Sequence, residues 1–280
     1  MRPPWNTPDQ ELIEKIGPGE VTRAVPWSSL TPVQKSFQRT KMSIHAAMIS
    51  RMDREIGRVL DQLKAMDAFR DTVILFISDN GASSEQLIRA DGHDASAPPG
   101  SARSHLCLGP GWSSAANTPF RLHKSWVHEG GIASPLIAHW PNGIRDRGKL
   151  RHNPCHFVDL LPTMLELGGA APSQPDSTAP PLAGRSLVKT FSKDGSVPHD
   201  FIYFNHAKNR AIRVGDWKLV AAGESSPWEL HDVRADRSES KNLASAQPGK
   251  AGEMAALWKE KDEEFVRVRE SAPPSRMERL

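Results

Sequence analysis

The sequence predicts an α/β protein: a mixed, mostly parallel sheet with flanking helices, followed by a small C-terminal antiparallel sheet and a helix. Three observations support this. A long helical pattern leads into a run of β-branched and aromatic residues at 72–78, which is typical of a strand buried on both faces in a mostly parallel sheet. Beyond residue 200 the chain turns into short strand-like segments. An amphipathic segment at 248–268 then predicts a closing helix.

The first half is expected to hold one long helix and two strands. Residues 9–16 predict a short helix, and Thr31-Pro32 is a typical start for a much longer one. Apolar residues recur at helical spacing up to residue 63, so we expect this helix to pack by one face, with its methionines in the core. Residues 81–118 are rich in Gly, Ser, Ala and Pro and predict a long irregular stretch, either a functional loop or a disordered one. Residues 132–140 predict the second strand.

The second half has shorter elements. Residues 159–167 predict a helix, and 170–184 predicts a linker or surface loop. Four strands are expected at 201–204, 210–214, 217–221 and 228–233. We therefore expect two domains, an α/β domain over residues 1–175 and a small α+β unit over residues 176–280.

Composition argues against several classes of protein. The net charge of +3 over 280 residues lacks the basic excess of a nucleic-acid-binding protein. No segment approaches the ~18 apolar residues of a membrane span, and the first residues lack the apolar run of a secretory signal. Cys107 and Cys155 form no CxxC pair and are expected to be buried free thiols.

A candidate metal site follows the first predicted strand. Asp79 and Asn80 offer a carboxylate and an amide oxygen, which suit Ca²⁺ or Mg²⁺. Ligands of α/β sheets bind beyond the carboxyl ends of the strands. The same residues, followed by glycine, are equally typical of a simple turn, so both interpretations stay open at this point.

A candidate anion-binding lysine, Lys124, precedes the second predicted strand. A lysine near a metal-bound anion neutralises charge and donates hydrogen bonds to transferring oxygens. Gly130 and Gly131 follow it and would let backbone pass close to a site. A lone lysine is more often a solvated surface charge, so the hypothesis depends on finding Lys124 together with the Asp-Asn pair.

Both features occur in an order that resembles the sulfatase family of the alkaline-phosphatase superfamily, particularly bacterial arylsulfatases. The resemblance covers about residues 40–265. It rests on the helix at 52–60, the strand and Asp-Asn pair at 72–81, the segment from Asn117 to Arg121 followed by Lys124 and Glu129-Gly130-Gly131, the helix at 156–163 and the hairpin at 213–219.

The resemblance implies an alkaline-phosphatase-like fold and a sulfuric ester hydrolase, which releases sulfate from a small-molecule or glycan sulfate ester. It implies that Asp79 and Asn80 are two ligands of a single Ca²⁺, and that Lys124 is a catalytic residue contacting the substrate sulfate. In the family the nucleophile is a formylglycine hydrate, made from Cys or Ser in a Cys/Ser-x-Pro-x-Arg motif. Family members are often periplasmic or secreted, whereas this sequence alone indicates no compartment.

The chain departs from the family at the nucleophile. Neither Cys107 nor Cys155 begins a Cys/Ser-x-Pro-x-Arg segment, and the early Asp-Asp metal pair is absent too. Two oxygen ligands fall short of the about six to eight of a calcium site, so only a partial site is expected. We therefore expect the C-terminal part of a sulfatase with an incomplete sheet, inactive by itself and able to associate through an uncovered sheet edge.

Histidines crowd the region around the lysine, and they raise an alternative. His93, His105, His123 and His128 could form a zinc site, but no cysteine stands at ligand spacing. We expect His93, His123 and His128 to line the substrate entrance instead, with His206 as a further candidate. Two other functions stay open: a non-catalytic binding or interaction protein on a sulfatase scaffold, and a related metal-dependent phosphoryl-transfer enzyme.

Overall fold

The computed structural model describes residues 10–16, 20, 23–86, 92–170 and 182–271. They form two compact units. Unit 1 spans Met1–Arg70 and Asn80–Pro135, and unit 2 spans Asp71–Asp79 and Leu136–Leu280. The domain boundary expected at residue 175 lies outside the described residues and stays a prediction. No helix in the described parts of the chain is both long and apolar enough to cross a membrane.

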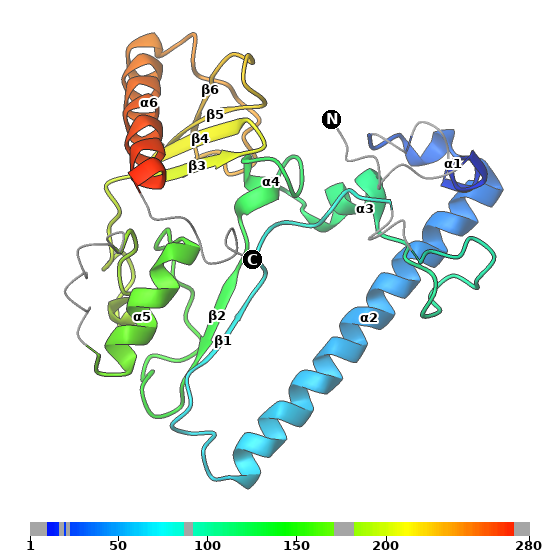
Figure 1. The fold of residues 1–280 in the computed structure, drawn as a ribbon, viewed down its shortest axis with the longest axis horizontal. Coiled ribbons are helices and arrows are strands. Elements are labelled where there is room, and N and C mark those ends of the chain that lie inside the picture. Colours follow the sequence, from blue (N-terminus) through cyan, green and yellow to red (C-terminus); the bar gives the residue numbers. More distant parts are fainter. Residues whose placement is uncertain (1–9, 17–19, 21–22, 87–91, 171–181, 272–280) are drawn as a thin grey trace. The chain divides into compact units, whose positions relative to one another are not determined.

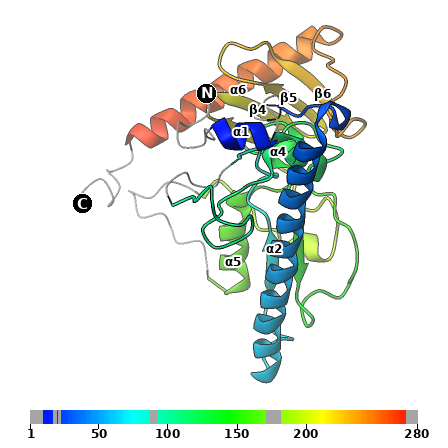
Figure 2. The same ribbon diagram turned by 90° about the vertical axis from the view of Figure 1, so that its right-hand side faces the viewer.

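Unit 1 is organised by the long helix α2 (Pro32–Ala65). It begins as predicted: the Thr31 hydroxyl accepts from the Gln34 backbone N–H at 3.3 Å, and the Gln34 side chain accepts from the Thr31 N–H at 3.0 Å. The short helix α1 (Gln10–Ile16) lies beside its first turns (Figures 1 and 2). There the Gln38 amide donates to the Ile16 carbonyl at 3.0 Å, which joins the two helices.

The expected packing of α2 by its apolar stripe is wrong for the described residues. Met48, Ile49 and Met52 are exposed, and the buried side chains of α2 are Gln38 and Lys41. The Lys41 ammonium donates to the Gln86 side chain at 2.8 Å. Burial lowers the pKa of Lys41 to about 8, while the nearby Glu20 carboxylate opposes that shift. Buried polar contacts thus join the first half of α2 to the rest of unit 1.

One helix lies inside the stretch expected to be irregular. Helix α3 (Gly109–Ala116) contains two glycines, a proline and two serines, all poor helix formers. It forms because tertiary contacts hold its start: the Glu20 carboxylate accepts from the Gly111 N–H, and the Glu85 carbonyl accepts from the Gly109 N–H at 2.9 Å. A second short helix, α4 (Glu129–Ile132), stands just before the second predicted strand.

Unit 2 contains the two strands predicted from apolar runs, β1 (Ile74–Ile77) and β2 (Leu136–His139). They pair with each other in antiparallel fashion, with Phe76 opposite Ile137. Burial of β1 on both faces is not found among the described residues, because Phe76 is 45% exposed and Ile137 is 59% exposed. Periodicity predicts a strand but does not identify its neighbours.

The predicted C-terminal meander is confirmed. Four antiparallel strands run in chain order, and one helix covers a face of the sheet (Figure 1). The core between sheet and helix contains Ile212, Leu219, Leu230 and Met254. The elements are β3 (Ile202–His206), β4 (Asn209–Val214), β5 (Trp217–Ala221), β6 (Glu229–Asp232) and α6 (Pro248–Ser271).

Along the chain between β2 and β3, unit 2 has a short helix, α5 (Leu160–Leu167). It is preceded by the 3-10 turn η4 (Phe157–Asp159) and followed by η5 (Val188–Phe191). The α5 helix agrees with its predicted bounds to within one residue. The linker expected at 170–184 falls mostly on residues outside the described ranges.

Candidate functional site

The candidate site lies where three backbone segments of unit 1 meet: residues 80–82, 117–124 and 128–131. The Gly81 N–H donates to the Gly131 carbonyl at 3.0 Å, and the Lys124 N–H donates to the Ala82 carbonyl at 3.1 Å. These bonds place Lys124 beside the residues that follow Asn80, although the two are far apart in sequence.

Glycines make this crossing possible. A Cβ atom on Gly81 would lie 1.8 Å from the Gly130 carbonyl oxygen, and one on Gly131 would lie 2.0 Å from that of Trp126. At Gly130 the added Cβ would stand 2.3 Å from the carbonyl oxygen of Arg121. Larger residues at these three positions would therefore force the segments apart.

Asn117 ties two of the segments together with its side chain. Its Oδ1 accepts from the Ala82 N–H at 2.9 Å, and its Nδ2 donates to the Leu122 carbonyl at 3.1 Å. Leu122 and Ser125 on either side of Lys124 have φ of 65° and 81°, a left-handed backbone that bulky residues rarely adopt. Such strain persists only where surrounding contacts hold it, and Asn117 supplies one of them.

The Lys124 side chain points toward an acidic neighbour. Its ammonium lies 3.6 Å from a carboxylate oxygen of Glu85, with the side chains 42% and 28% exposed. The Ser83 hydroxyl donates to the same oxygen at 2.5 Å and accepts from the Glu85 N–H at 3.2 Å. The lysine is therefore half-exposed and paired, and its carboxylate partner is held in place by a second side chain.

The Cys107 thiol is not an activated nucleophile. Burial raises the pKa of the Cys107 thiol to about 11, and the negative charge of Glu85 adds to the shift. Cys107 is therefore protonated at neutral pH and unreactive. Both cysteines are free, but the expectation that both are buried is wrong, because Cys107 is half-buried and Cys155 is exposed. Short-range sequence gives no measure of how completely a thiol is covered.

Asp79 and Asn80 are the two candidate metal ligands that the sequence predicts. Asp79 is exposed and Asn80 is half-buried. In the described ranges no group of three or more His, Cys, Asp or Glu side chains could hold a metal ion. Two oxygen donors do not satisfy the about six to eight ligands of Ca²⁺. The described residues therefore do not form a complete calcium site, and they give no support to a zinc site.

The four histidines expected at the substrate entrance differ in burial and in their contacts. His93 is half-buried and accepts from the His105 N–H at 3.1 Å. His123 is half-buried, and its carbonyl accepts from the Trp126 N–H at 3.1 Å. His128 is fully buried, precedes α4 and has its Nε2 3.4 Å from an Arg121 guanidinium nitrogen. His206 ends β3 in unit 2 and is exposed. Their roles stay predictions.

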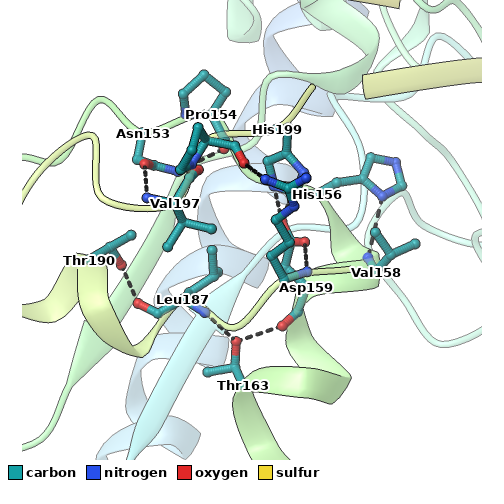
Figure 3. Close-up of polar contacts among 12 residues, drawn as sticks. Asn153, Pro154, His156, Val158, Asp159, Thr163, Leu187, Thr190, Val197 and His199 are labelled. Carbon is teal, nitrogen blue, oxygen red and sulfur yellow. Dashed lines mark hydrogen bonds and ion pairs between the residues drawn. The ribbon is translucent and has the colours of Figure 1, made fainter. Parts of the chain in front are cut away.

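Unit 2 contains a separate polar cluster around Asp159, which is fully buried (Figure 3). One carboxylate oxygen accepts from the His156 N–H at 2.8 Å and lies 3.0 Å from the His199 ring nitrogen, and the other accepts from the Arg185 N–H at 2.8 Å. Thr163 donates to the Asp159 carbonyl at 2.6 Å and accepts from the Leu187 N–H at 2.9 Å. These bonds fasten α5 to the chain around 185–199.

Two residues at the site were not singled out from the sequence: Asn117 and Glu85. Asn117 lies in the segment that resembles the sulfatase family, which is the one signal that could have identified it. Glu85 lies in a stretch without periodicity, four residues beyond Gly81. Only the folded structure shows that it reaches Lys124.

Comparisons with known proteins identify the family of the chain. The family model described as Sulfatase matches residues 23–170, and the one described as N-sulphoglucosamine sulphohydrolase, C-terminal, matches residues 120–268. An uncharacterised sulfatase of Schizosaccharomyces pombe is 31% identical over 256 residues, covering 83% of this chain and 45% of that protein. An arylsulfatase of Klebsiella aerogenes is 30% identical over 172 residues, covering 58% of this chain and 37% of the relative. The chain thus spans less than half the length of these relatives.

A solved structure shares the fold. The structure of BT4656 in complex with its substrate, D-glucosamine-2-N,6-O-disulfate, aligns with a TM-score of 0.59 at 20% identity, covering 85% of this chain and 44% of that one. At this identity the likeness shows the α/β fold of alkaline-phosphatase type. Together with the family model, which matches more than half of the chain, it supports one conclusion: the chain belongs to the sulfatase family.

Proposed function

We propose that this chain contributes the sulfate-binding lysine and two metal ligands to a sulfuric ester hydrolase. The observation that carries the proposal is the hydrogen bond of the Lys124 N–H to the Ala82 carbonyl, at 3.1 Å, which holds the lysine beside the residues that follow Asn80. An ammonium group there donates hydrogen bonds to sulfate oxygens and offsets the negative charge that builds up on the group being transferred.

Calcium, bound in part by Asp79 and Asn80, would supply further positive charge for the sulfate. The substrate class that we propose is a sulfate ester of a small molecule or a glycan. The match of residues 120–268 to the C-terminal model of a sulphohydrolase supports the class, as does a structural relative whose substrate is a disulfated glucosamine.

We further propose that the 280-residue chain alone does not turn over sulfate esters. It contains no Cys/Ser-x-Pro-x-Arg segment, and burial raises the pKa of the Cys107 thiol to about 11, which keeps it neutral at pH 7. Positioned charges assist a displacement at sulfur, but they do not replace the covalent nucleophile.

The purified chain, supplied with Ca²⁺ and a chromogenic aryl sulfate, should bind the ester without releasing the phenol. Substitution Lys124→Ala should abolish that binding. The matched control is Lys208→Ala, since Lys208 is likewise paired with a glutamate, Glu224, at 2.6 Å in unit 2. Phenol release that survives repurification and disappears in Lys124→Ala would contradict the claim of inactivity. Equal binding by both variants would contradict the role of Lys124.

A further inference from the structure

Glu85 stands next to the one lysine to which the proposed function assigns the sulfate. Its carboxylate lies 3.6 Å from the Lys124 ammonium and is oriented by the Ser83 hydroxyl at 2.5 Å. Its backbone carbonyl accepts from the Gly109 N–H at 2.9 Å, which fixes the residue to the start of α3. A negative charge is thus held at a defined place beside the anion-binding lysine.

A fixed negative charge has a different effect on anions of different charge. A sulfate monoester carries one negative charge at any pH near neutrality. A phosphate monoester carries one negative charge below its second pKa of about 6 and two above it. Coulombic repulsion from Glu85 is proportional to the charge of the ligand, so the dianion is repelled twice as strongly as the monoanion.

We infer that Glu85 is a specificity-determining residue, which biases the Lys124 site toward monoanionic sulfate esters and against dianionic phosphate esters. The inference rests on the proposed function, because it requires Lys124 to bind the ester anion. Specificity of this kind needs an element that repels the wrong ligand as well as one that attracts the right ligand. Lys124 attracts both esters, and Glu85 supplies the repulsion.

The size of the effect can be estimated for an anion bound to the Lys124 ammonium. A charge about 5 Å from the ligand, screened mostly by water, changes the affinity for a monoanion about fivefold. The change for a dianion is then the square of that factor, about 25-fold. This relation between the two factors separates a charge effect from a general loosening of the site, which would weaken the binding of both esters alike.

The test is a calorimetric titration with phenyl sulfate and phenyl phosphate at pH 5.0 and pH 8.0, in buffer containing Ca²⁺. At pH 8.0, Glu85→Gln should raise the affinity for phenyl sulfate about fivefold and for phenyl phosphate about 25-fold. At pH 5.0 the two gains should be nearly equal, because the phosphate has taken up its second proton. Ser83→Ala, which frees the carboxylate, should shift both affinities in the same direction by smaller factors.

The matched control is Glu224→Gln, which removes the same charge from the exposed Lys208 pair in unit 2 and should change neither affinity. Equal gains for both esters at pH 8.0, or gains no larger than in Glu224→Gln, would overturn the inference while leaving Lys124 in place. Unchanged binding in Lys124→Ala, or no binding of either ester to any form of the chain, would overturn the proposed function and this inference together.

Discussion

At the scale of single residues, the sequence singled out candidate site residues where a short motif contains side chains suited to binding a metal or an anion. Lys124 and Asn80 stand out by residue type, and the structure brings their segments together through the Lys124–Ala82 hydrogen bond. Asn117 lies in a segment that resembles the family, but its bridging role could not be predicted, because that role depends on which two backbone groups its amide meets. Nor could Glu85, because nothing local indicates that a carboxylate in a glycine- and serine-rich stretch will reach a particular lysine.

Asn117 should be required to keep residues 80–82 beside the segment that contains Lys124. Substitution Asn117→Ala removes the acceptor for the Ala82 N–H and the donor to the Leu122 carbonyl. We expect a loss of about 1–3 kcal/mol in the free energy of unfolding, because half-buried backbone groups lose their partners. Hydrogen exchange at the Ala82 amide should speed up markedly, as measured by NMR.

Asn153 provides the control for this prediction. Its side chain also bridges backbone groups, donating to the Val197 carbonyl at 3.0 Å and accepting from the Val197 N–H at 3.1 Å, but in unit 2. Asn153→Ala should lower the free energy of unfolding by a similar amount and leave exchange at Ala82 slow. An unchanged Ala82 exchange rate in Asn117→Ala would show that the bridge does not hold the segment.

At the scale of elements, regular sequence patterns predicted local structure correctly, but they did not predict the tertiary contacts between elements. The helix start at Thr31 and the C-terminal meander formed as predicted, because both depend on neighbours in sequence. Helix α3 was missed, because its sequence disfavours a helix and Glu20 and Glu85 stabilise it from a distance. The partner of β1 was missed for a related reason, since a strand's apolar pattern is the same whichever neighbour it pairs with.

The segment before α5 should lose stability in mild acid. Burial lowers the pKa of His156, and His199 adds to that effect while Asp159 opposes it. The folded state therefore binds fewer protons at His156 than the unfolded state, whose imidazole titrates near pH ~6.5. Its contribution to stability is complete above that pH and is lost as the pH falls through it toward 5.

In the parent, the Val158 N–H donates to Nδ1 of His156 at 3.3 Å. His156→Asn removes the titrating group and keeps a side-chain acceptor for this N–H. Denaturant titrations between pH 7.5 and 5 should show a shallower loss of unfolding free energy in this variant than in the parent. The same change at the exposed His152 serves as the control and should leave the slope unaltered. Parallel slopes for the parent and His156→Asn would rule out His156 as the source.

At the scale of the whole molecule, apolar surface is divided unevenly among the described elements. The meander and α6 enclose a core in which Ile212, Leu219 and Leu230 are fully buried. In contrast, α2 and the β1–β2 pair leave several large apolar side chains in contact with water. The sequence predicted these residues as core from their periodicity, and periodicity reports that a face is apolar, not that a partner covers it.

This uneven distribution predicts that two substitutions in unit 2 lower the free energy of unfolding by very different amounts. Leu219→Ala opens a cavity in the enclosed core and should cost about 2–5 kcal/mol of unfolding free energy. Ile137→Thr removes an apolar group from a side chain that is 59% exposed, so its cost should stay within about 1 kcal/mol.

The Ile137→Thr change should also reduce binding of a fluorescent dye specific for apolar surface, and it should weaken concentration-dependent self-association measured by sedimentation. A cost for Ile137→Thr as large as that of Leu219→Ala would mean that this face is covered in solution. The difference between the two costs, compared at low and high protein concentration, then tells whether a second copy of the chain provides the cover.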